Sequence, residues 1–257
     1  MSDALREERD GHVLTLVLSR PEKRNPLSLD LMRALTARLH AAAGDPDVHA
    51  VVIGADGPAF SAGHDLRELT GRDEAFYAEV FDACADLMTA IHATPQPVIA
   101  RVQGIATAAG CQLVAACDLA VAAESATFAT PGVRIGLFCT TPMVEVARAV
   151  GRKRAMELLL TGEPIDAATA ASWGLVNRAV PDDRLDEAAA ALAHRVAQAS
   201  PLTVGIGKRA FWENLDLPLD EAYRHGSAVM CRNALARDAQ EGIAAFLEKR
   251  PAVWSGT

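Results

Sequence analysis

Short apolar runs and amphipathic helices alternate through the first two-thirds of this chain. Runs of aliphatic and β-branched residues at 12–18, 50–55, 97–102 and 119–122 predict strands. Between them, residues 28–43 and 74–93 place apolar side chains at helical spacing, and Ser28 predicts a helix N-cap. This alternation is typical of an α/β fold, in which helices cross over a parallel or mixed sheet.

From residue 183 onward the pattern is almost entirely helical. Leu185, Ala189 and Leu192 fall on one face of a predicted helix, and Pro201 and Pro218 sit where new helices can begin. A last helix is predicted over 234–249. We therefore divide the chain into an α/β core at 1–182 and a helical C-terminal region at 183–257.

Composition excludes several classes of function. Half of the 257 residues are apolar and the net charge is −8, which argues against disorder and against wrapping nucleic acid. No apolar run has the length of a membrane span, and the charged N-terminus resembles no secretory or transit peptide. Five cysteines without a CxxC pair favour a reducing, cytoplasmic setting and give no metal site.

Two segments of small residues each follow a predicted strand and lead into a predicted helix start. They are residues 59–66, which contain Gly63, and residues 102–113, which contain Gly104 and Gly110. A tight turn or close helix packing would explain either segment alone. Two free N–H groups that converge would instead form an oxyanion hole. Dinucleotide, phosphate-loop, serine-hydrolase and HExxH zinc motifs are absent from the sequence.

Several stretches together resemble the crotonase (enoyl-CoA hydratase/isomerase) superfamily. They are the motifs at 19–21, 25–27, 60–66, 104–118, 158–165, 171–177 and 241–251, and the stretch 128–139 narrows the resemblance to one subgroup. The resemblance implies an α/β crotonase (ClpP-like) spiral of ββα units with a helical C-terminal trimerisation region. It also implies a homotrimer or dimer of trimers that binds an acyl-CoA or enoyl-CoA thioester. No metal or redox cofactor is implied, because coenzyme A enters as part of the substrate.

The resemblance assigns roles to particular positions. The oxyanion-hole donors would be the backbone N–H groups of His64 and Ala109, and Ala109 stands where the family usually has glycine. Arg20 adds positive charge near the implied coenzyme A strip. The implied substrate-binding positions are Lys23, Arg24, Asn25, Pro26, Ala62, His64, Asp65, Leu66, Ala108, Ala109, Pro131, Phe246 and Lys249.

The sequence departs from a hydratase at the two positions that would carry the catalytic glutamates. Gln112 and Gly132 stand there, and neither can exchange a proton at neutral pH. Because a positioned acid or base contributes about 10²–10⁴-fold, we expect hydration of enoyl-CoA to fall to a trace.

Three replacement groups are considered, each with a simpler interpretation. His64 could exchange protons or merely fill a turn, Glu145 could act or be an exposed helix carboxylate, and Cys111 could attack or be a buried apolar residue. Three functions therefore stay open. The chain acts on enoyl-CoA with replacement groups, isomerises or decarboxylates a thioester through its enolate, or binds acyl-CoA without catalysis.

Overall fold

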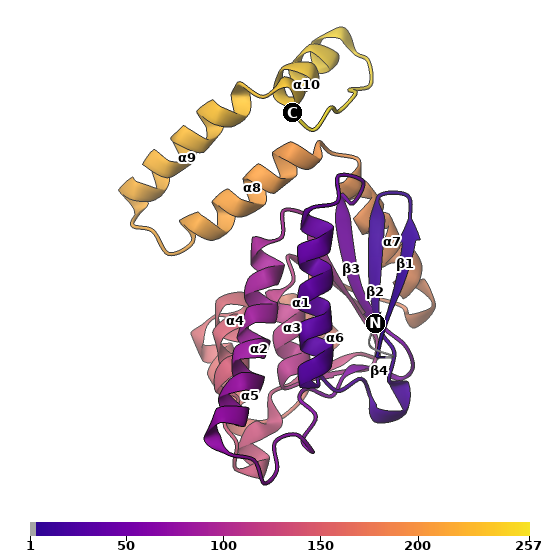
Figure 1. The fold of residues 1–257 in the computed structure, drawn as a ribbon, viewed down its shortest axis with the longest axis vertical. Coiled ribbons are helices and arrows are strands. Elements are labelled where there is room, and N and C mark those ends of the chain that lie inside the picture. Colours follow the sequence, from indigo (N-terminus) through magenta and orange to yellow (C-terminus); the bar gives the residue numbers. More distant parts are fainter. Residues whose placement is uncertain (1–3) are drawn as a thin grey trace.

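Two β-sheets and ten α-helices form the part of the chain that the computed structural model describes, residues 4–257 (Figure 1). The larger sheet has the strand order β1-β2-β3-β5-β7-β10. Its strands are β1 (Leu5–Asp10), β2 (Val13–Leu18), β3 (Ala50–Ala55), β5 (Val98–Val102), β7 (Leu119–Ala123) and β10 (Arg178–Val180). The four strands predicted from apolar runs are β2, β3, β5 and β7, and each is confirmed.

The edge strand β1 was not predicted. It pairs antiparallel with β2, whereas β2, β3, β5, β7 and β10 run parallel. The sequence of β1, LREERD, is mostly charged and mostly exposed. An edge strand needs little apolar surface and charged side chains protect it from further pairing, so the hydrophobic pattern gives no signal there.

The smaller sheet consists of short strands that follow those of the larger one. It has the order β4-β6-β8-β9, with β4 (Ala59–Ser61), β6 (Ile105–Thr107), β8 (Thr127–Ala129) and β9 (Ile165–Asp166). Strand β3 leads into β4 and then a helix, and β5 leads into β6 and then a helix. These repeated ββα units are the architecture that the family resemblance implies. Segments of two or three residues are too short for a periodicity to show.

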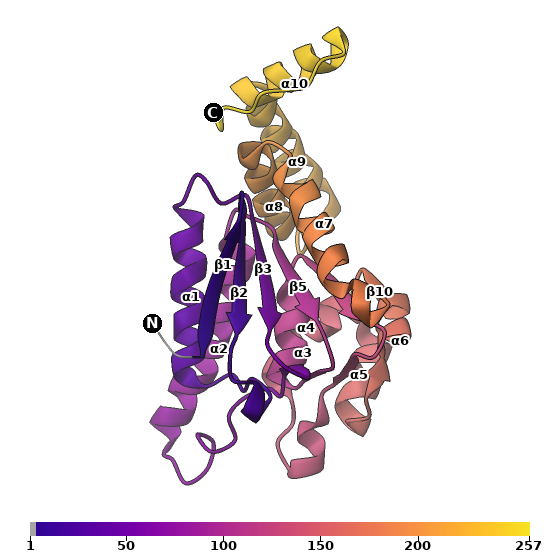
Figure 2. The same cartoon turned by 90° about the vertical axis from the view of Figure 1, so that its right-hand side faces the viewer.

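Helices cover both faces of the larger sheet (Figure 2). On one face lie α1 (Leu29–Ala43), α2 (Glu74–Ala93) and α3 (Ala109–Ala116), followed by α4 (Thr140–Val150), α5 (Arg152–Thr161) and α6 (Ala167–Trp173). Ser28 caps α1, as predicted, by accepting a hydrogen bond from the Leu31 N–H. The main core fills the space between the sheet and these helices, with Leu16, Met32, Ile53 and Leu87 fully or almost fully buried.

Helix α7 (Leu185–Ala197) packs on the opposite face of the sheet. Its Ala193 and Ala197 contact Val52 and Ile99, and its N-terminal half packs against β7. By packing, α7 therefore belongs to the core, although the division at residue 183 groups it with the C-terminal helices by secondary structure.

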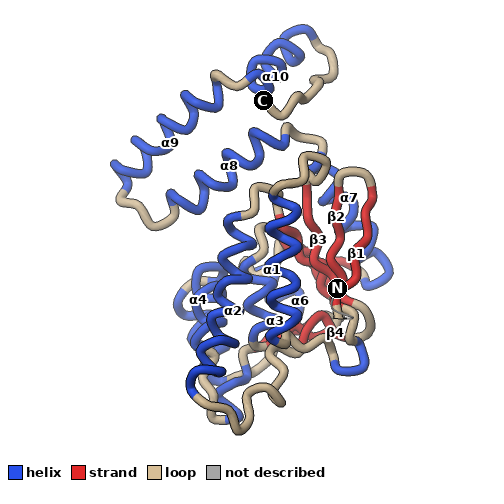
Figure 3. Tube along the Cα trace, viewed as in Figure 1, coloured by secondary structure: helices blue, strands red, loops and turns tan. Residues whose placement is uncertain are grey.

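The last three helices project from the core as an arm (Figure 3). They are α8 (Pro201–Asn214), α9 (Leu219–Ala234) and α10 (Arg237–Glu248). Pro201 is the first residue of α8, as predicted. The last helix predicted over 234–249 is confirmed as α10, although it begins at Arg237 because Ala234 is the last residue of α9. Large apolar side chains on the arm are exposed, including Leu235 (84%) and Phe246 (83%).

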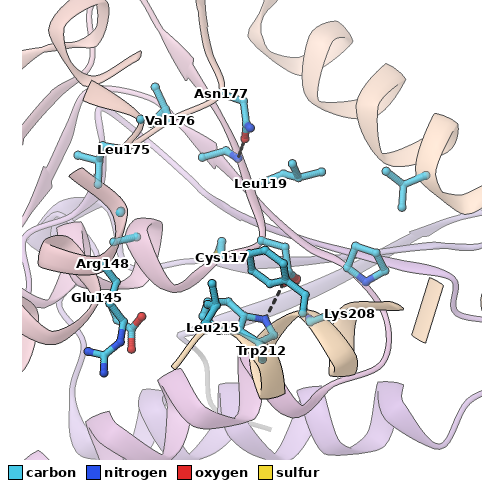
Figure 4. A pocket seen from close by; sticks show the side chains of 18 of the residues that line it. Cys117, Leu119, Glu145, Arg148, Leu175, Val176, Asn177, Lys208, Trp212 and Leu215 are labelled. Carbon is cyan, nitrogen blue, oxygen red and sulfur yellow. Dashed lines mark hydrogen bonds and ion pairs between the residues drawn. The ribbon is translucent and has the colours of Figure 1, made fainter. Parts of the chain in front are cut away.

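A buried ion pair attaches α8 to the core. Lys208 Nζ lies 2.6 Å from Asp118 Oδ2 and donates to the carbonyl oxygens of Ile91 and Gln96. Trp212 stacks on His92 with ring centroids 3.6 Å apart. Beside this contact is a cavity of about 580 Å³, whose wall includes Lys208 and Trp212 from α8 and the side chains drawn in Figure 4.

Candidate active site

The two small-residue segments meet in space. Gly63 follows β4 with φ +85°, and Ala109 begins α3 immediately after β6. A Cβ atom built on Gly63 would lie 2.9 Å from Ala108 Cβ and 3.2 Å from the Ala109 nitrogen. Only glycine fits this approach, because any side chain would push the two segments apart.

The backbone N–H groups of His64 and Ala109 are free donors beside a cavity. Neither donates a hydrogen bond within residues 4–257. Ala109 is the first residue of α3, so its N–H has no partner inside the helix. The neighbouring Gly63 carbonyl is occupied by the Leu27 N–H at 2.8 Å, which fixes the direction of this peptide. Two free donors on touching segments are suited to bind one oxygen atom.

Both donors border a second cavity of about 380 Å³ with a mostly apolar wall. It is formed by the segment after β4, by α2, by the start of α3 and by the turn before α4. The lining residues are Ala62, His64, Leu66, Leu69, Phe81, Ala108, Ala109, Pro131, Gly132, Arg134, Ile135, Leu137, Phe138, Cys139, Thr140, Thr141 and Pro142. No aspartate or glutamate is among these residues of the described chain.

The His64 side chain forms part of this wall. Both ring nitrogens are buried and neither makes a hydrogen bond of normal geometry. The ring meets Phe81 edge-to-face, with centroids 5.6 Å apart. Burial lowers the pKa of the imidazole, and the Leu27 backbone offsets part of this effect. The ring is therefore neutral near pH 7.

Within the implied coenzyme A strip, Asn25 is a structural residue. Its side chain is fully buried, accepts from the Arg20 N–H and donates to the carbonyls of Asp56 and Ala59. It holds the loop after β2 against the chain between β3 and β4, so its amide is not available to a ligand. Pro26 is also buried, which leaves the exposed Lys23 and Arg24 as the accessible cations of the strip.

Residues 62, 65 and 66 are close neighbours of the His64 donor in the chain. The Ala62 N–H donates to the Arg24 carbonyl, which joins this segment to the coenzyme A strip. Leu66 is 55% exposed and lines the cavity. Asp65 accepts from the Arg67 N–H, as in a local turn.

The two positions of the missing glutamates differ in their surroundings. Gln112 is 3% exposed, is not among the lining residues, and accepts from Cys84 Sγ at 3.5 Å. Gly132 does line the cavity, but a Cβ there would overlap the Leu137 carbonyl oxygen and lie 2.8 Å from Cys139 Sγ. A glutamate at 132 would therefore require this turn to move.

The other replacement groups considered from the sequence lie elsewhere. Glu145 is 7% exposed, so its interpretation as an exposed helix carboxylate is wrong, and it lines the cavity beside α8 rather than this one. Its carboxylate lies 3.5 Å from His92 Nε2, and burial raises its pKa. Cys111 is fully buried, and burial raises the pKa of its thiol to about 12, which removes it as a thiolate nucleophile.

Phe246 and Lys249 are far from the cavity of their own chain. Phe246 lies in the last turn of α10 and Lys249 directly follows this helix, on the arm and far from β4 (Figure 1). Their implied contact with the nucleotide would have to come from another subunit.

Sequence reasoning missed most of the cavity wall. Phe81 and Leu69 were not considered as site residues, nor were Arg134, Phe138 and Cys139. In the sequence, the apolar residues at 133, 135, 137 and 138 were a signal that this connection carries more than a turn; the structure shows that all four are exposed.

Comparison with known proteins identifies the family. The family profile described as "Enoyl-CoA hydratase/isomerase" matches residues 8–257. The chain belongs to the enoyl-CoA hydratase/isomerase family. This family consists of enzymes that act on acyl-CoA, and the fold of the chain is the crotonase fold. Among the residues described, no group of three potential metal ligands is present and no helix is long and apolar enough to cross a membrane.

Similar proteins of this family cover nearly the whole chain. Human mitochondrial enoyl-CoA hydratase domain-containing protein 3 is 49% identical over 249 residues, which are 96% of this chain and 81% of that protein. Its crystal structure has a TM-score of 0.96, covers 98% of this chain and 100% of that chain, and is 46% identical. A Mycobacterium smegmatis enoyl-CoA hydratase has a TM-score of 0.95 at 45% identity, with 98% of each chain covered. The resemblance of stretch 128–139 to one subgroup is thus confirmed.

Replacing Gln112 with glutamate is expected to destabilise the protein without restoring hydration. A carboxylate there would be buried with only the Cys84 thiol as partner, which costs roughly 1–3 kcal/mol. The loss should grow as pH rises above the carboxyl's unfolded pKa of about 4.3, since the folded protein then buries a charge. Thermal unfolding and crotonyl-CoA absorbance measure the two effects, with the exposed Gln198→Glu as control. A clear gain in hydration by Gln112→Glu would contradict this placement.

Proposed function

We propose that this chain binds an acyl-CoA thioester with its carbonyl oxygen between the backbone N–H groups of His64 and Ala109. The observation that carries the proposal is the close approach of Gly63 to Ala109, which brings two unpartnered donors together. The acyl chain would occupy the apolar cavity beside them. The exposed side chains of Lys23 and Arg24 would lie toward the phosphates of coenzyme A.

These donors would make the α-carbon of the thioester acidic. As a proton leaves this carbon, negative charge moves to the carbonyl oxygen, where fixed N–H groups stabilise it. The N-terminus of α3 adds its partial positive charge at the same point. The chain's contribution is therefore stabilisation of a thioester enolate.

Hydration should be weak, since no carboxylate of residues 4–257 lines the cavity to activate water or to protonate the α-carbon. Double-bond isomerisation or decarboxylation through the same enolate needs fewer proton-transfer groups. A protein that binds acyl-CoA without turning it over is the remaining alternative. The 2,3-dehydroadipyl-CoA hydratase of Escherichia coli, 35% identical over 249 residues, shows that hydratases occur among the relatives.

We also propose that α8–α10 form subunit contacts in a homotrimer or dimer of trimers. Leu219, Leu235 and Phe246 on the arm are each at least 74% exposed. Exposed apolar surface of this kind is typical of a protein–protein contact. Phe246 and Lys249 would then reach a neighbouring subunit's coenzyme A. Residues 1–182 would carry out the chemistry, and residues 183–257 would form the subunit contacts. A cytoplasmic location remains a prediction, and relatives of the chain are named as mitochondrial.

A panel of acyl-CoA thioesters tests this function. Titration calorimetry would measure binding of saturated, 2-enoyl and 3-enoyl thioesters, and mass spectrometry would follow their products. We expect micromolar binding, on the order of −8 kcal/mol, and only a trace of crotonyl-CoA hydration. Turnover near that of ordinary hydratases would refute the weak-hydration proposal, and an absence of binding would refute the function itself. Binding without any product would select the non-catalytic alternative.

A further inference from the structure

The turn that begins α3 holds an alanine in a conformation that normally belongs to glycine. Ala108 has φ +50° and ψ −118°, the first central position of a type II′ turn, where the Cβ atom of an L-residue is crowded. Arg24 and Lys249 also have positive φ, but their ψ angles of 38° and 40° place them in the left-handed helical region that many caps use. Ala108 lies outside that region, so its backbone is strained.

Hydrogen bonds on both sides hold Ala108 in this conformation. Its N–H donates to the Ala129 carbonyl of β8 at 2.9 Å, and its carbonyl accepts from the Gln112 N–H of α3 at 3.0 Å. These two bonds fix the planes of the peptide groups before and after Ala108, and with them its φ and ψ. Residues in such conformations persist only where the surrounding structure imposes them, and they cluster at functional sites.

The unusual ψ angle sets the direction of one proposed oxyanion-hole donor. The Ala109 N–H belongs to the same trans peptide as the Ala108 carbonyl, and the two groups of a trans peptide point in opposite directions. Because the carbonyl points along α3 to Gln112, the Ala109 N–H points away from the helix. Ala108 and Ala109 both line the candidate cavity. An ordinary ψ at residue 108 would rotate this peptide and turn the donor elsewhere.

The methyl group of Ala108 contacts the segment that carries the other donor. A Cβ atom built on Gly63 would lie 2.9 Å from Ala108 Cβ. The methyl group therefore faces Gly63, the residue whose carbonyl carbon is bonded to the His64 nitrogen. A glycine at position 108 would adopt the turn without strain, but it would leave a gap at this contact and let the peptide rotate more freely. The methyl group thus limits the movement of both donors.

We propose that Ala108 is a positioning residue that fixes the direction and spacing of the His64 and Ala109 donors, while its own backbone stays strained. The inference rests on the thioester-binding function proposed above. It predicts that Ala108→Gly makes the protein more stable and the carbonyl site weaker. A residue that only packs would change stability and binding in the same direction.

The test compares wild type with Ala108→Gly in binding butyryl-CoA and S-butyl-CoA, the thioether that lacks the carbonyl oxygen. Titration calorimetry gives both affinities, and their ratio isolates the contribution of the donors because the coenzyme A contacts are common to the two ligands. We expect this ratio to fall by about 2–10-fold in Ala108→Gly, the effect of weakening one hydrogen bond. The infrared C=O stretch of bound, carbonyl-¹³C-labelled butyryl-CoA should also shift less to lower frequency than in wild type.

Thermal unfolding provides a second readout, with Ala190→Gly as its control. Ala190 is exposed within α7, where glycine lowers helix propensity, so the melting temperature of this variant should fall by about 2–4 °C. The melting temperature of Ala108→Gly should instead rise by about 2–4 °C, because the strain is released. Ala190→Gly should keep the wild-type ratio of affinities.

The outcomes separate this inference from the proposed function. If wild type binds butyryl-CoA no more tightly than S-butyl-CoA and the C=O stretch is unshifted, the oxyanion hole and the role of Ala108 are both refuted. If wild type prefers the thioester and Ala108→Gly keeps the same ratio and C=O shift, the role of Ala108 is refuted and the binding function stands. A melting temperature of Ala108→Gly that falls as in Ala190→Gly refutes the strained backbone. A weaker preference for the thioester together with a higher melting temperature supports the inference.

Discussion

Replacing Gly63 with alanine is expected to lower the rate of C2-proton exchange of a bound acyl-CoA by about 10²–10³-fold, the usual effect of losing one oxyanion-hole donor. The added methyl group would lie 2.9 Å from Ala108 Cβ and from the Thr107 carbonyl oxygen, and 3.2 Å from the Ala109 nitrogen. The two segments must therefore move apart, and their N–H groups can no longer reach one oxygen. The exchange rate is measured by mass spectrometry in D₂O.

A matched control for this change is Gly71→Ala, in the same connection between β4 and α2. Gly71 also has a positive φ, +68°, but a Cβ there meets no atom within 4 Å. Both variants carry the strain of a left-handed alanine, about 1–2 kcal/mol, so thermal unfolding should shift in both. Only Gly63→Ala should lose exchange activity. Equal activity in the two variants would show that the touching segments do not form the oxyanion hole.

Replacing Lys208 with methionine is expected to lower the free energy of unfolding by about 3–5 kcal/mol, the effect of removing one partner from a buried ion pair. The Lys208 side chain is 6% exposed and Asp118 is 16% exposed, so water cannot replace the lost ammonium. Asp118 would keep only the Val98 N–H and the longer contact from the Trp212 indole. The carbonyls of Ile91 and Gln96 would lose their common donor.

Urea unfolding at neutral pH measures this change, and Lys153→Met is its control. Lys153 is exposed on α5, where the same substitution should alter stability by less than about 0.5 kcal/mol. Because Lys208 attaches α8 to the core, the variant should also loosen the arm, and amide hydrogen exchange in α8 should increase. An unfolding free energy equal to that of Lys153→Met would show that this ion pair does not hold the arm in place.

The strands of the core were predictable because their signal is local. Strands β2, β3, β5 and β7 each bury a nearly continuous apolar run between two helical layers. The edge strand β1 and the small sheet were not predictable. Their residues are charged or too few, and they are strands only because a neighbouring strand offers hydrogen bonds.

Part of the candidate site could likewise be predicted from the sequence, and part could not. The two glycine-containing segments could be singled out from the sequence, since a strand, a small-residue run and a helix start are neighbours in the chain. Which individual side chains are buried or already hydrogen-bonded could not be predicted from the sequence. The side-chain amide of Asn25 donates its hydrogen bonds to residues more than 30 positions away. Gly132 is enclosed by Leu137 and Cys139.

By itself, the sequence determined the alternating α/β core, the two turns that can supply free N–H groups, and the absence of glutamates at positions 112 and 132. Only the tertiary structure decided that these turns touch, that Glu145 is buried in a different cavity, and that the His64 ring packs edge-to-face on Phe81. The physical reason is the distance along the chain over which each effect acts. Periodicity and turn chemistry act over a few residues, whereas burial, contact and pKa depend on groups that folding brings together from distant parts of the chain.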